Sequence, residues 1–429
     1  MRKKVGILTL GITLILCGAA IILARYTDWQ FSDIYLLWPA FLILLGLEFI
    51  FTKLWYDFRK HEVYLSPSGI SIFLAVVIIL ISSAWANQGL FHSNWNWKFN
   101  FSNFWPESYN ETIEETYSLK REELPNVEKI VIDNINGSVE VLPSDDGRFE
   151  LKAQIKIATN DKESASKLID KVITVDEGRE MNIKSNHPTS NRIHSLQHVN
   201  MKLLVPKEIE VQITTGFGHV LIRDMENNVT IRQKHSDVDI SNIKGNVKVD
   251  CSFGDIYARK IDGDANINNA HGQVRIEDIT GSAQVENSFN TTEARQIGKD
   301  LNVQSKHGQV KAEYITGRVI IKNEFAEVSC SNIEGNLEVL AEHSKVILND
   351  IWGDINVETS YNVIHLTNPS FADANIDAST TFGSIKSDDS IGLIVKKESN
   401  LEEASTVNGN GNQKIRLKNQ HGEIRINMN

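Results

Sequence analysis

The sequence predicts an all-β protein, a parallel β-solenoid with about 18 residues per turn, that follows an N-terminal region of three transmembrane helices. Three observations carry this prediction. An 18-residue repeat runs through the C-terminal half of the chain, apolar and polar residues alternate inside each repeat, and three long apolar segments lie in the first 87 residues. A strict period near 20 residues is typical of solenoid proteins.

One aromatic or histidine residue opens each repeat, and we number the repeat from it as position zero. These residues form a structural ladder with eight unbroken intervals of 18 residues: Phe217, His235, Phe253, His271, Phe289, His307, Phe325, His343 and Tyr361. Position eight is as regular. After Met225 in the first repeat it holds a core ladder of Ile243, Ile261, Ile279, Ile297, Ile315, Ile333 and Ile351.

Apolar residues two apart occupy positions three and five, as in Val238 and Ile240, and again positions twelve and fourteen, as in Val247 and Val249. This alternation places every second side chain on one face of an extended strand. A repeat of this length has room for two short strands and two bends, so successive turns should stack as parallel strands roughly 4.8 Å apart. The handedness of the coil does not follow from the spacing.

Two further positions indicate how the turns are joined. Glycine at position ten, such as Gly245, suits a bend that needs a positive φ or a close backbone approach. Position sixteen continues the inward-facing parity but holds small or amide residues, such as Asn269 and Asn287. We expect these side chains to bond the turns above and below at an inner corner.

The ends of the array are less regular. Residues 129–142 are interpreted as an early, imperfect turn. Residues 161–172 predict a short helix with Asp161 as its N-cap, which could cover the open end of the stack. The stretch 386–415 is rich in Ser, Asn and Gly, so longer loops are expected in the last turns.

The first 87 residues predict a membrane region. Apolar segments at about 5–24, 35–52 and 69–86 are each about long enough to cross a hydrocarbon core. Basic residues precede the first segment and lie between the second and third, which puts the N-terminus in the cytoplasm and the C-terminal domain outside the cell. The alternative is a cleaved signal peptide followed by two spans.

The predicted organisation is therefore three transmembrane helices in residues 1–87, a juxtamembrane linker at 88–124 and an extracytoplasmic solenoid at 125–429. The linker is rich in aromatic residues and Asn. Such a stretch usually lies at the membrane interface, and a partner-binding stalk is the alternative.

The charge, the cysteines and the histidines of the sequence limit which partners, cross-links and metal sites are expected. The net charge is −11, which argues against nucleic acid. Three cysteines cannot make a disulfide framework, and Cys251 and Cys330 lie four turns apart, beyond disulfide reach. No cofactor or metal is predicted. Successive histidines of the structural ladder are two turns apart, too far to share one metal ion. Stacking between aromatic rings is therefore expected, with pH sensing as the alternative.

Catalytic signals are weak. Carboxylates recur in two columns, with Asp237, Asp255 and Glu327 at position two and Asp264, Asp300 and Asp354 at position eleven. Some glycan-processing enzymes cluster carboxylates on a solenoid groove, but these alternate with Asn, Gln, Lys or Ser, and no convergent triad is visible. We therefore expect a protein that is not an enzyme.

Residues from about 125 to the end resemble the bacterial β-strand-repeat domain known as "putative adhesin", a domain of unknown function. The resemblance rests on Val131–Val139 (Val-Ile-Asp-Asn-Ile-Asn-Gly-Ser-Val), on the Val205-Pro206-Lys207 step and on the repeated Phe/His-Gly-x-Val phrase. The second apolar segment, at Trp38–Leu47, is similar to the transmembrane region of LiaI/LiaF-like proteins. That resemblance implies a part in cell-envelope stress signalling.

The leading hypothesis is a non-catalytic, multi-pass protein of the cell membrane whose exterior solenoid binds or scaffolds an envelope component, in envelope-stress signalling. The partners it implies are the lipid bilayer, a membrane sensor kinase or transporter, and a cell-wall or surface glycan. The first alternative is a surface adhesin that binds glycans or ligands on host or neighbouring cells. The second is a solenoid enzyme that processes glycans.

Overall fold

The computed structural model describes residues 2–5, 64–67, 111–186, 194–406 and 411–429. The chain divides into two compact units, Met1–Ser108 and Tyr109–Asn429. In the first, β1 (Arg2–Val5) pairs in parallel with β2 (Tyr64–Pro67). The predicted spans lie outside the described residues except for Val5, and so does the linker before residue 111. Within the described ranges, no helix is long and apolar enough to cross a bilayer.

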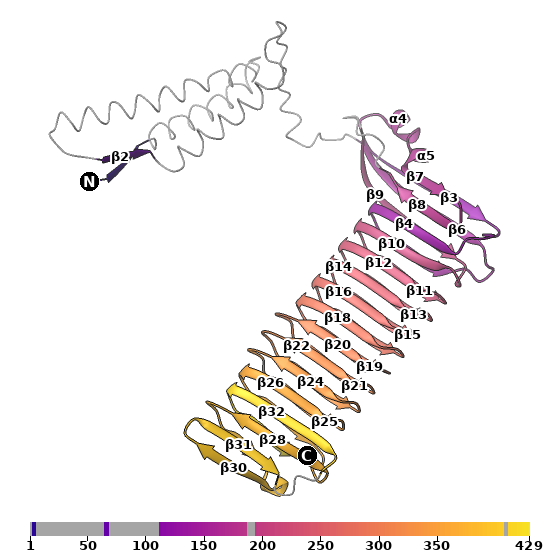
Figure 1. Ribbon diagram of the computed structural model, residues 1–429. Helices are drawn as coiled ribbons and strands as arrows, with labels where there is room; N and C mark the ends of the chain where they lie inside the picture. Colours follow the sequence, from indigo (N-terminus) through magenta and orange to yellow (C-terminus); the bar gives the residue numbers. More distant parts are fainter. Residues whose placement is uncertain (1, 6–63, 68–110, 187–193, 407–410) are drawn as a thin grey trace, which may run out of the picture. The chain divides into compact units, whose positions relative to one another are not determined.

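The second unit is a β-solenoid in which each turn contributes one strand to a 16-stranded sheet and one to a 15-stranded sheet (Figure 1). In the regular part the strands of the first sheet are β10 (Glu210–Phe217), β12 (Val229–His235), β14 (Val247–Phe253), β16 (Ala265–His271), β18 (Ala283–Phe289), β20 (Leu301–Ser305), β22 (Val319–Asn323), β24 (Leu337–Ala341) and β26 (Ile355–Tyr361). Those of the second are β11 (Val220–Met225), β13 (Val238–Ile243), β15 (Ile256–Ile261), β17 (Val274–Ile279), β19 (Thr292–Ile297), β21 (Val310–Ile315), β23 (Val328–Ile333), β25 (Val346–Ile351) and β27 (Ile364–Asn368).

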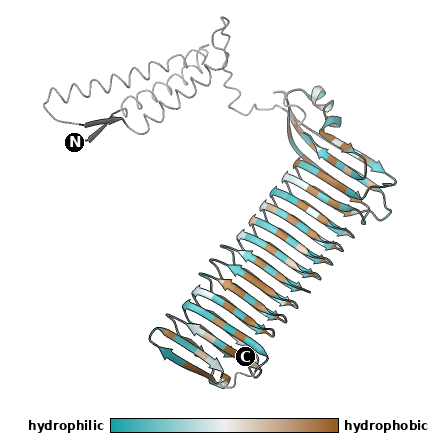
Figure 2. Ribbon diagram, viewed as in Figure 1, coloured by the Kyte–Doolittle hydropathy of each residue, from teal (hydrophilic) through white to brown (hydrophobic). Residues whose placement is uncertain are grey.

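The strand register confirms the 18-residue turn. Val247 pairs with Ala265, and Ile256 pairs with Val274 in the other sheet, both in parallel. Buried and exposed residues alternate along most of each regular strand, as in β14 and β16. Figure 2 shows the matching bands of apolar and polar residues along the ribbons. Because every second residue faces the space between the sheets, the core is a continuous column of buried aliphatic side chains.

The bends differ from expectation in one respect. Glycine at position ten does not have a positive φ; it permits close approach, since a Cβ at Gly335 would lie 2.2 Å from the carbonyl oxygen of Gly317. In this bend the positive φ is found at position seven instead. There every regular bend holds a non-glycine residue with φ between 55° and 59°: Asp224, Asn242, Lys260, Asp278, Gln296, Tyr314, Asn332 and Asp350.

At the N-terminal end, chain order and stacking order differ. Residues 129–142 form β4 (Lys129–Asn136) and most of β5 (Val139–Pro143), which pair with β10 and β11. A later segment, β8 (Glu180–Ser185) and β9 (His194–Val205), pairs on their other side as the outermost turn. Antiparallel strands then extend both sheets. β7 (Ile173–Asp176) pairs with β8 in one sheet. In the other, β6 (Phe149–Thr159) pairs with β9, and β3 (Glu111–Arg121) pairs with β6 at the edge.

Two short helices stand where one was predicted. They are α4 (Lys162–Ser166) and α5 (Ile169–Val172). The side chain of Asp161 accepts a hydrogen bond from the backbone N–H of Ser164 at 3.2 Å, as an N-cap does. The helix α5 contacts both β3 and β7, the outermost strands of the two sheets, so the helices lie at the N-terminal end of the stack.

The C-terminal end is also built out of order. After β27 the chain forms β28 (Ala374–Thr380), β29 (Ile385–Ser387), a 3-10 helix η4 (Asp389–Ile391), β30 (Leu393–Glu398) and β31 (Leu401–Thr406). It then returns as β32 (Gln413–His421) and β33 (Ile424–Met428), which insert between the last regular turn and β28–β29. The expectation of longer loops at 386–415 is wrong for much of this stretch. Ser399 and Asn400 form the tight turn of the β30–β31 hairpin, and most other described residues of the stretch belong to strands or to η4.

Candidate functional site

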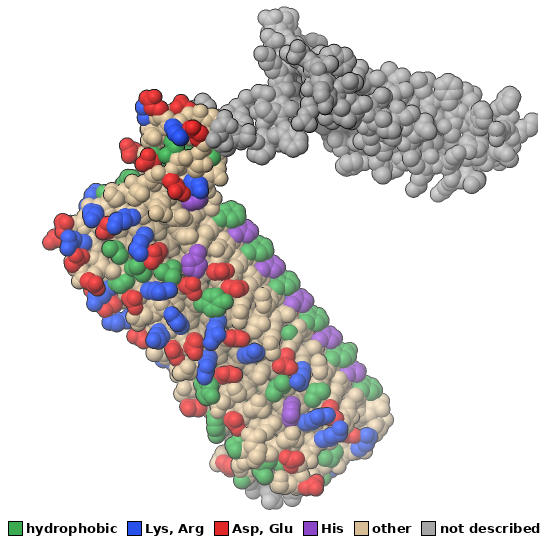
Figure 3. Space-filling view, turned by 180° about the vertical axis from the view of Figure 1, so that it is seen from behind, with side chains coloured by type: hydrophobic (Ala, Val, Ile, Leu, Met, Phe, Trp, Pro, Cys, Tyr) green, Lys and Arg blue, Asp and Glu red, His purple; other side chains and the backbone are tan. Residues whose placement is uncertain are grey.

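The residues at position zero form a continuous stack of rings along one corner of the solenoid, which we call the aromatic ridge. Figure 3 shows it as a column in which apolar and His side chains alternate. Neighbouring ring centroids are 4.6–5.1 Å apart and the planes are within 16° of parallel. The ridge contains Phe217, His235, Phe253, His271, Phe289, His307, Phe325, His343, Tyr361, His421 and Phe382.

The stacking of the rings determines which of their surfaces can contact a ligand. Because each inner ring has a neighbour on both faces, its faces are covered and only its edge reaches solvent. A sugar ring could stack on these aromatic faces only by opening the column. Every histidine of the ridge has a ring on each side, and Phe253 and Phe289 remain 45% and 44% exposed along their edges.

Directly behind the ridge runs the inward-facing column at position sixteen. The side-chain amide of Asn269 donates to the carbonyl of Gly254 at 3.0 Å, and that of Asn323 to the carbonyl of Gly308 at 2.9 Å. Each bond joins a strand to the corner that follows the preceding strand of the same sheet, nearly one full turn earlier in the chain. The core ladder lies at the far end of the second-sheet strands, beside the opposite bend, and all seven of its isoleucines are buried, at 2% exposure or less. The corner that carries the ridge is thus held by backbone pairing, amide bonds and ring stacking together.

A shallow polar groove of about 510 Å³ runs along the outer face of the 16-stranded sheet, on the side chains just before the ridge in sequence. It crosses seven successive strands, from β16 to β32. Its outward-facing side chains come from positions fifteen and seventeen: Asn268, Glu286, Ser288, Gln304, Lys306, Lys322, Glu324, Leu340, Glu342, Glu358, Ser360, Lys418 and Gln420. These residues offer amide, hydroxyl, ammonium and carboxylate groups in a line, with little net charge.

The carboxylates at positions two and eleven do not converge on a common point. Asp237 accepts the backbone N–H of Asp255 at 2.9 Å, and Asp264 accepts that of Ser282 at 2.8 Å. Asn246 accepts the N–H of Asp264 in the same way. Asp255, Asp300 and Asp354 make the equivalent bonds to Gln273, Arg318 and Lys414. Glu327 instead pairs with Lys345 at 3.2 Å and accepts from the Gln309 amide.

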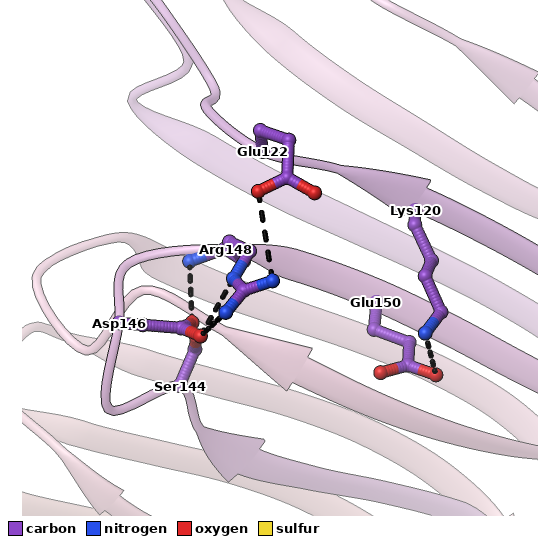
Figure 4. Close-up of polar contacts among 6 residues, drawn as sticks. All are labelled: Lys120, Glu122, Ser144, Asp146, Arg148 and Glu150. Carbon is purple, nitrogen blue, oxygen red and sulfur yellow. Dashed lines mark hydrogen bonds and ion pairs between the residues drawn. The ribbon is translucent and has the colours of Figure 1, made fainter.

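A second polar cluster lies at the turn between β5 and β6 (Figure 4). The carboxylate of Asp146 accepts from the Ser144 hydroxyl at 2.8 Å and from Nε of Arg148 at 2.6 Å. These two hydrogen bonds, the Ser144 bond first, lower the pKa of Asp146 to about 2. Arg148 also lies 3.6 Å from Glu122, next to β3, so the cluster ties the turn to that strand rather than forming a cavity.

The remaining reactive side chains are enclosed. Burial raises the pKa of the Cys251 thiol to about 11 and that of Cys330 to about 12, which keeps both thiols protonated near neutral pH. Among the described residues, no three His, Cys, Asp or Glu side chains gather as metal ligands would.

Two functional features were missed by sequence reasoning. The polar groove uses outward positions fifteen and seventeen, which read as an ordinary solvated face because their residues vary from turn to turn. The ridge continues through His421 and Phe382. Their phrases, His-Gly-Glu-Ile and Phe-Gly-Ser-Ile, are recognisable in the sequence as returns of the repeat, but their place in the column was missed because they stand out of register with it.

Comparisons with known proteins place the solenoid in a family. No curated protein matches the chain. Two solved structures match. One is a "putative cell adhesion protein" from Clostridium sporogenes, with 11% identity and a TM-score of 0.19, and the match covers 74% of this chain and 100% of that one. The other is a "putative adhesin" from Bacteroides fragilis, with 11% identity and a TM-score of 0.26, covering 75% and 98%. The Toastrack DUF4097 family model matches residues 127–427. The chain therefore belongs to the Toastrack DUF4097 family.

Proposed function

We propose that this protein is a non-catalytic, membrane-anchored protein of the cell envelope whose solenoid binds an extended envelope glycan along the polar groove. The shape and position of the groove are the main support for glycan binding. It lies on seven parallel strands that repeat at roughly 4.8 Å, so a linear polymer laid along the stack meets a similar polar surface at each strand.

The side chains of the groove suit a polymer rich in hydroxyl and amide groups. Gln304 and Asn268 can donate and accept hydrogen bonds, while Lys306 and Lys322 stand among acidic neighbours such as Glu324. The mixed signs favour a ligand of low net charge over a polyanion. The many weak, repeated contacts of such a surface would give affinity through length.

The contacts of the carboxylates favour binding over catalysis. Those in the columns at positions two and eleven mostly accept hydrogen bonds from the backbone of the next turn, as Asp264 does, a role that Asn246 fills equally well. A general acid or a nucleophile needs a carboxylate that cannot be replaced by an amide. Interchange of Asp and Asn along one column is what a structural role permits.

We further propose that residues 1–87 cross the membrane three times, with the N-terminus in the cytoplasm and the solenoid outside. The β1–β2 pairing supports this topology, because Arg2–Val5 and Tyr64–Pro67 must lie on the same side of the bilayer. Two crossings, at about 5–24 and 35–52, bring the chain back to that side. In this position the membrane helices can contact a sensor kinase or a transporter, which would couple glycan binding to envelope-stress signalling.

Full-length protein in lipid nanodiscs, titrated with purified cell-wall polysaccharide, tests the groove. Lys322→Glu combined with Gln304→Ala should weaken binding at least tenfold. Lys248→Glu, on the same sheet but outside the groove, is the matched control and should bind normally. Equal binding by all variants would exclude the groove. Binding only to polysaccharide from other cells would favour the adhesin alternative.

A second experiment tests the membrane part. In-cell crosslinking with mass spectrometry compares the native chain with one whose residues 1–87 are replaced by an unrelated anchor. Capture of a membrane kinase or transporter by the native chain alone supports signalling through the spans. If both chains capture only the same wall component, the spans act as a tether and the signalling part of the proposal is wrong.

A further inference from the structure

The aromatic ridge exposes more apolar surface than a solvated corner needs. Its Phe and Tyr side chains are 44–57% exposed. With about 200 Å² for a whole aromatic side chain, these six leave roughly 600 Å² in water, and the five exposed histidines raise the stripe to roughly 900 Å². Patches on monomeric proteins are typically about 300–600 Å², whereas a stable interface buries about 800 Å² on each partner.

The flanks of the ridge leave it accessible. The residue after each ring is small or an amide, as at Gly254, Gly272 and Asn290. The residue before it is Ser252, Ala270 or Ser288 in the same turns. Over Phe253–Phe289 these flanks carry no charge, so the rings there stand above them without an ionic rim that would have to be desolvated when a flat or similarly ridged surface approaches. Elsewhere a charged residue directly precedes the ring, at Lys234, Lys306, Glu324 and Glu342.

The regular spacing of the rings limits which partners can contact the whole ridge. Phe and His alternate at one ring per strand, with centroids 4.7–4.9 Å apart over Phe217–Phe289. A partner that contacts all the rings must carry groups at the same spacing over the same length. A second copy of this chain has that spacing by construction, and ring edges can pack beside ring edges along the whole stripe.

We propose that the aromatic ridge is the interface through which two copies of this chain associate side by side, with their solenoids aligned along the stacking direction. Stacked rings offer no free face to a sugar, and the edges of the Phe rings offer no hydrogen-bonding atom to a polar polymer, which leaves only the His edges and the Tyr361 hydroxyl. The polar groove lies beside the ridge, so association leaves a groove on each copy. This inference does not depend on what the groove binds.

The first test is the oligomeric state of the full-length chain in nanodiscs or detergent, measured by mass photometry over a dilution series. The variant Phe253→His/Phe289→His/Phe325→His keeps rings that the ridge already stacks, so the fold should survive, while apolar edge is lost. We expect a dimer for the native chain and at least a tenfold weaker dimer for the variant, with unchanged circular dichroism. A native chain that stays monomeric, or a variant that dimerises equally well, overturns the proposal.

Cysteine crosslinking locates the contact. Cys251 and Cys330 are buried, so cysteines introduced at Phe253, His307 or Tyr361 can be followed one at a time against the native chain as background. Thr316→Cys, at the opposite corner of the turn, is the matched control. Crosslinked dimers at all three ridge positions indicate parallel copies, and crosslinking at His307 alone, the middle ring of the eleven, indicates antiparallel copies. Crosslinking at Thr316 but not on the ridge overturns the assignment, as would ridge cysteines that react only with lipid-borne probes.

Discussion

His421 stacks on Tyr361 with ring centroids 4.8 Å apart, although the chain forms β28 to β31 between them. The last strands, β32 and β33, thus occupy the turn that follows β26 and β27, and the segment made earlier lies beyond them. Stability at this end therefore depends on a segment that returns from the end of the chain to pair on both of its edges.

Truncation before Gly411 should release the C-terminal end of the solenoid. Without β32, β28 loses its parallel partner, and β26 is left as an open edge. Hydrogen exchange should show lost protection in β26, β28 and β31, and little change near β14. Protection of β28 that survives truncation would mean that it pairs directly with β26.

Replacing Ile279 with Asp should destabilise the solenoid by more than about 3 kcal/mol, because it buries an unpaired charge at a position that is 1% exposed. Urea unfolding of the full-length protein measures the change. Gln284→Asp, on the solvent side of β18, the next strand along the chain, is the control and should shift the midpoint little. Equal stabilities would show that position eight does not face the core.

Gln296→Asn should stabilise the protein by about 0.5–1 kcal/mol, because Asn tolerates the left-handed backbone better than Gln. Gln296 has φ of 55°, and Asn332 occupies the same position in another turn with φ of 56°. The reverse change, Asn332→Gln, should cost a similar amount. Thermal melting decides the point, and two shifts of the same sign would rule out backbone strain as their cause.

Asp264→Ala should cost about 1 kcal/mol, since it leaves the N–H of Ser282 without the acceptor that now lies 2.8 Å away. Asp264→Asn should restore nearly all of the stability, as Asn246 serves the same purpose one turn earlier. Chemical denaturation compares the three proteins. If the Asn variant were as unstable as the Ala variant, the negative charge rather than the hydrogen bond would matter.

Glu402 should make the C-terminal end sensitive to acid. Its carboxylate accepts from Lys397 and from the N–H of Ile385, and these bonds, the Lys397 bond first, lower its pKa. A lowered pKa stabilises the fold at and above the ordinary carboxyl pKa, and this contribution is lost as the pH falls through the lowered value. Urea midpoints measured from neutral to acidic pH should fall less steeply for Glu402→Gln than for the native chain. Parallel curves would refute the assignment to this residue.

The regular turns were predictable because their information is local. Alternation at Val247 and Val249 sets the strand and its inward face, and the spacing from Phe253 to His271 sets the register, since each turn packs only on its neighbours. The His and Phe rings at position zero could be placed in one column for the same reason. Their exposure could not, because whether a corner side chain lies over the core or beside it depends on the geometry of the bend.

The sequence alone therefore determined the length of the turn, the direction of strand pairing, the core column and the ring column. All of these follow from the 18-residue repeat and from the alternation of inward and outward residues along each strand. Tertiary structure decided the order of the turns at both ends, where β8–β9 and β32–β33 pair out of chain order. An open sheet edge accepts any segment with suitable side chains, and a one-dimensional spacing does not say which distant segment reaches it. The tertiary structure also decided the positive φ at position seven and the formation of the polar groove. Both the strained backbone and the shared concave face exist only once neighbouring turns have stacked.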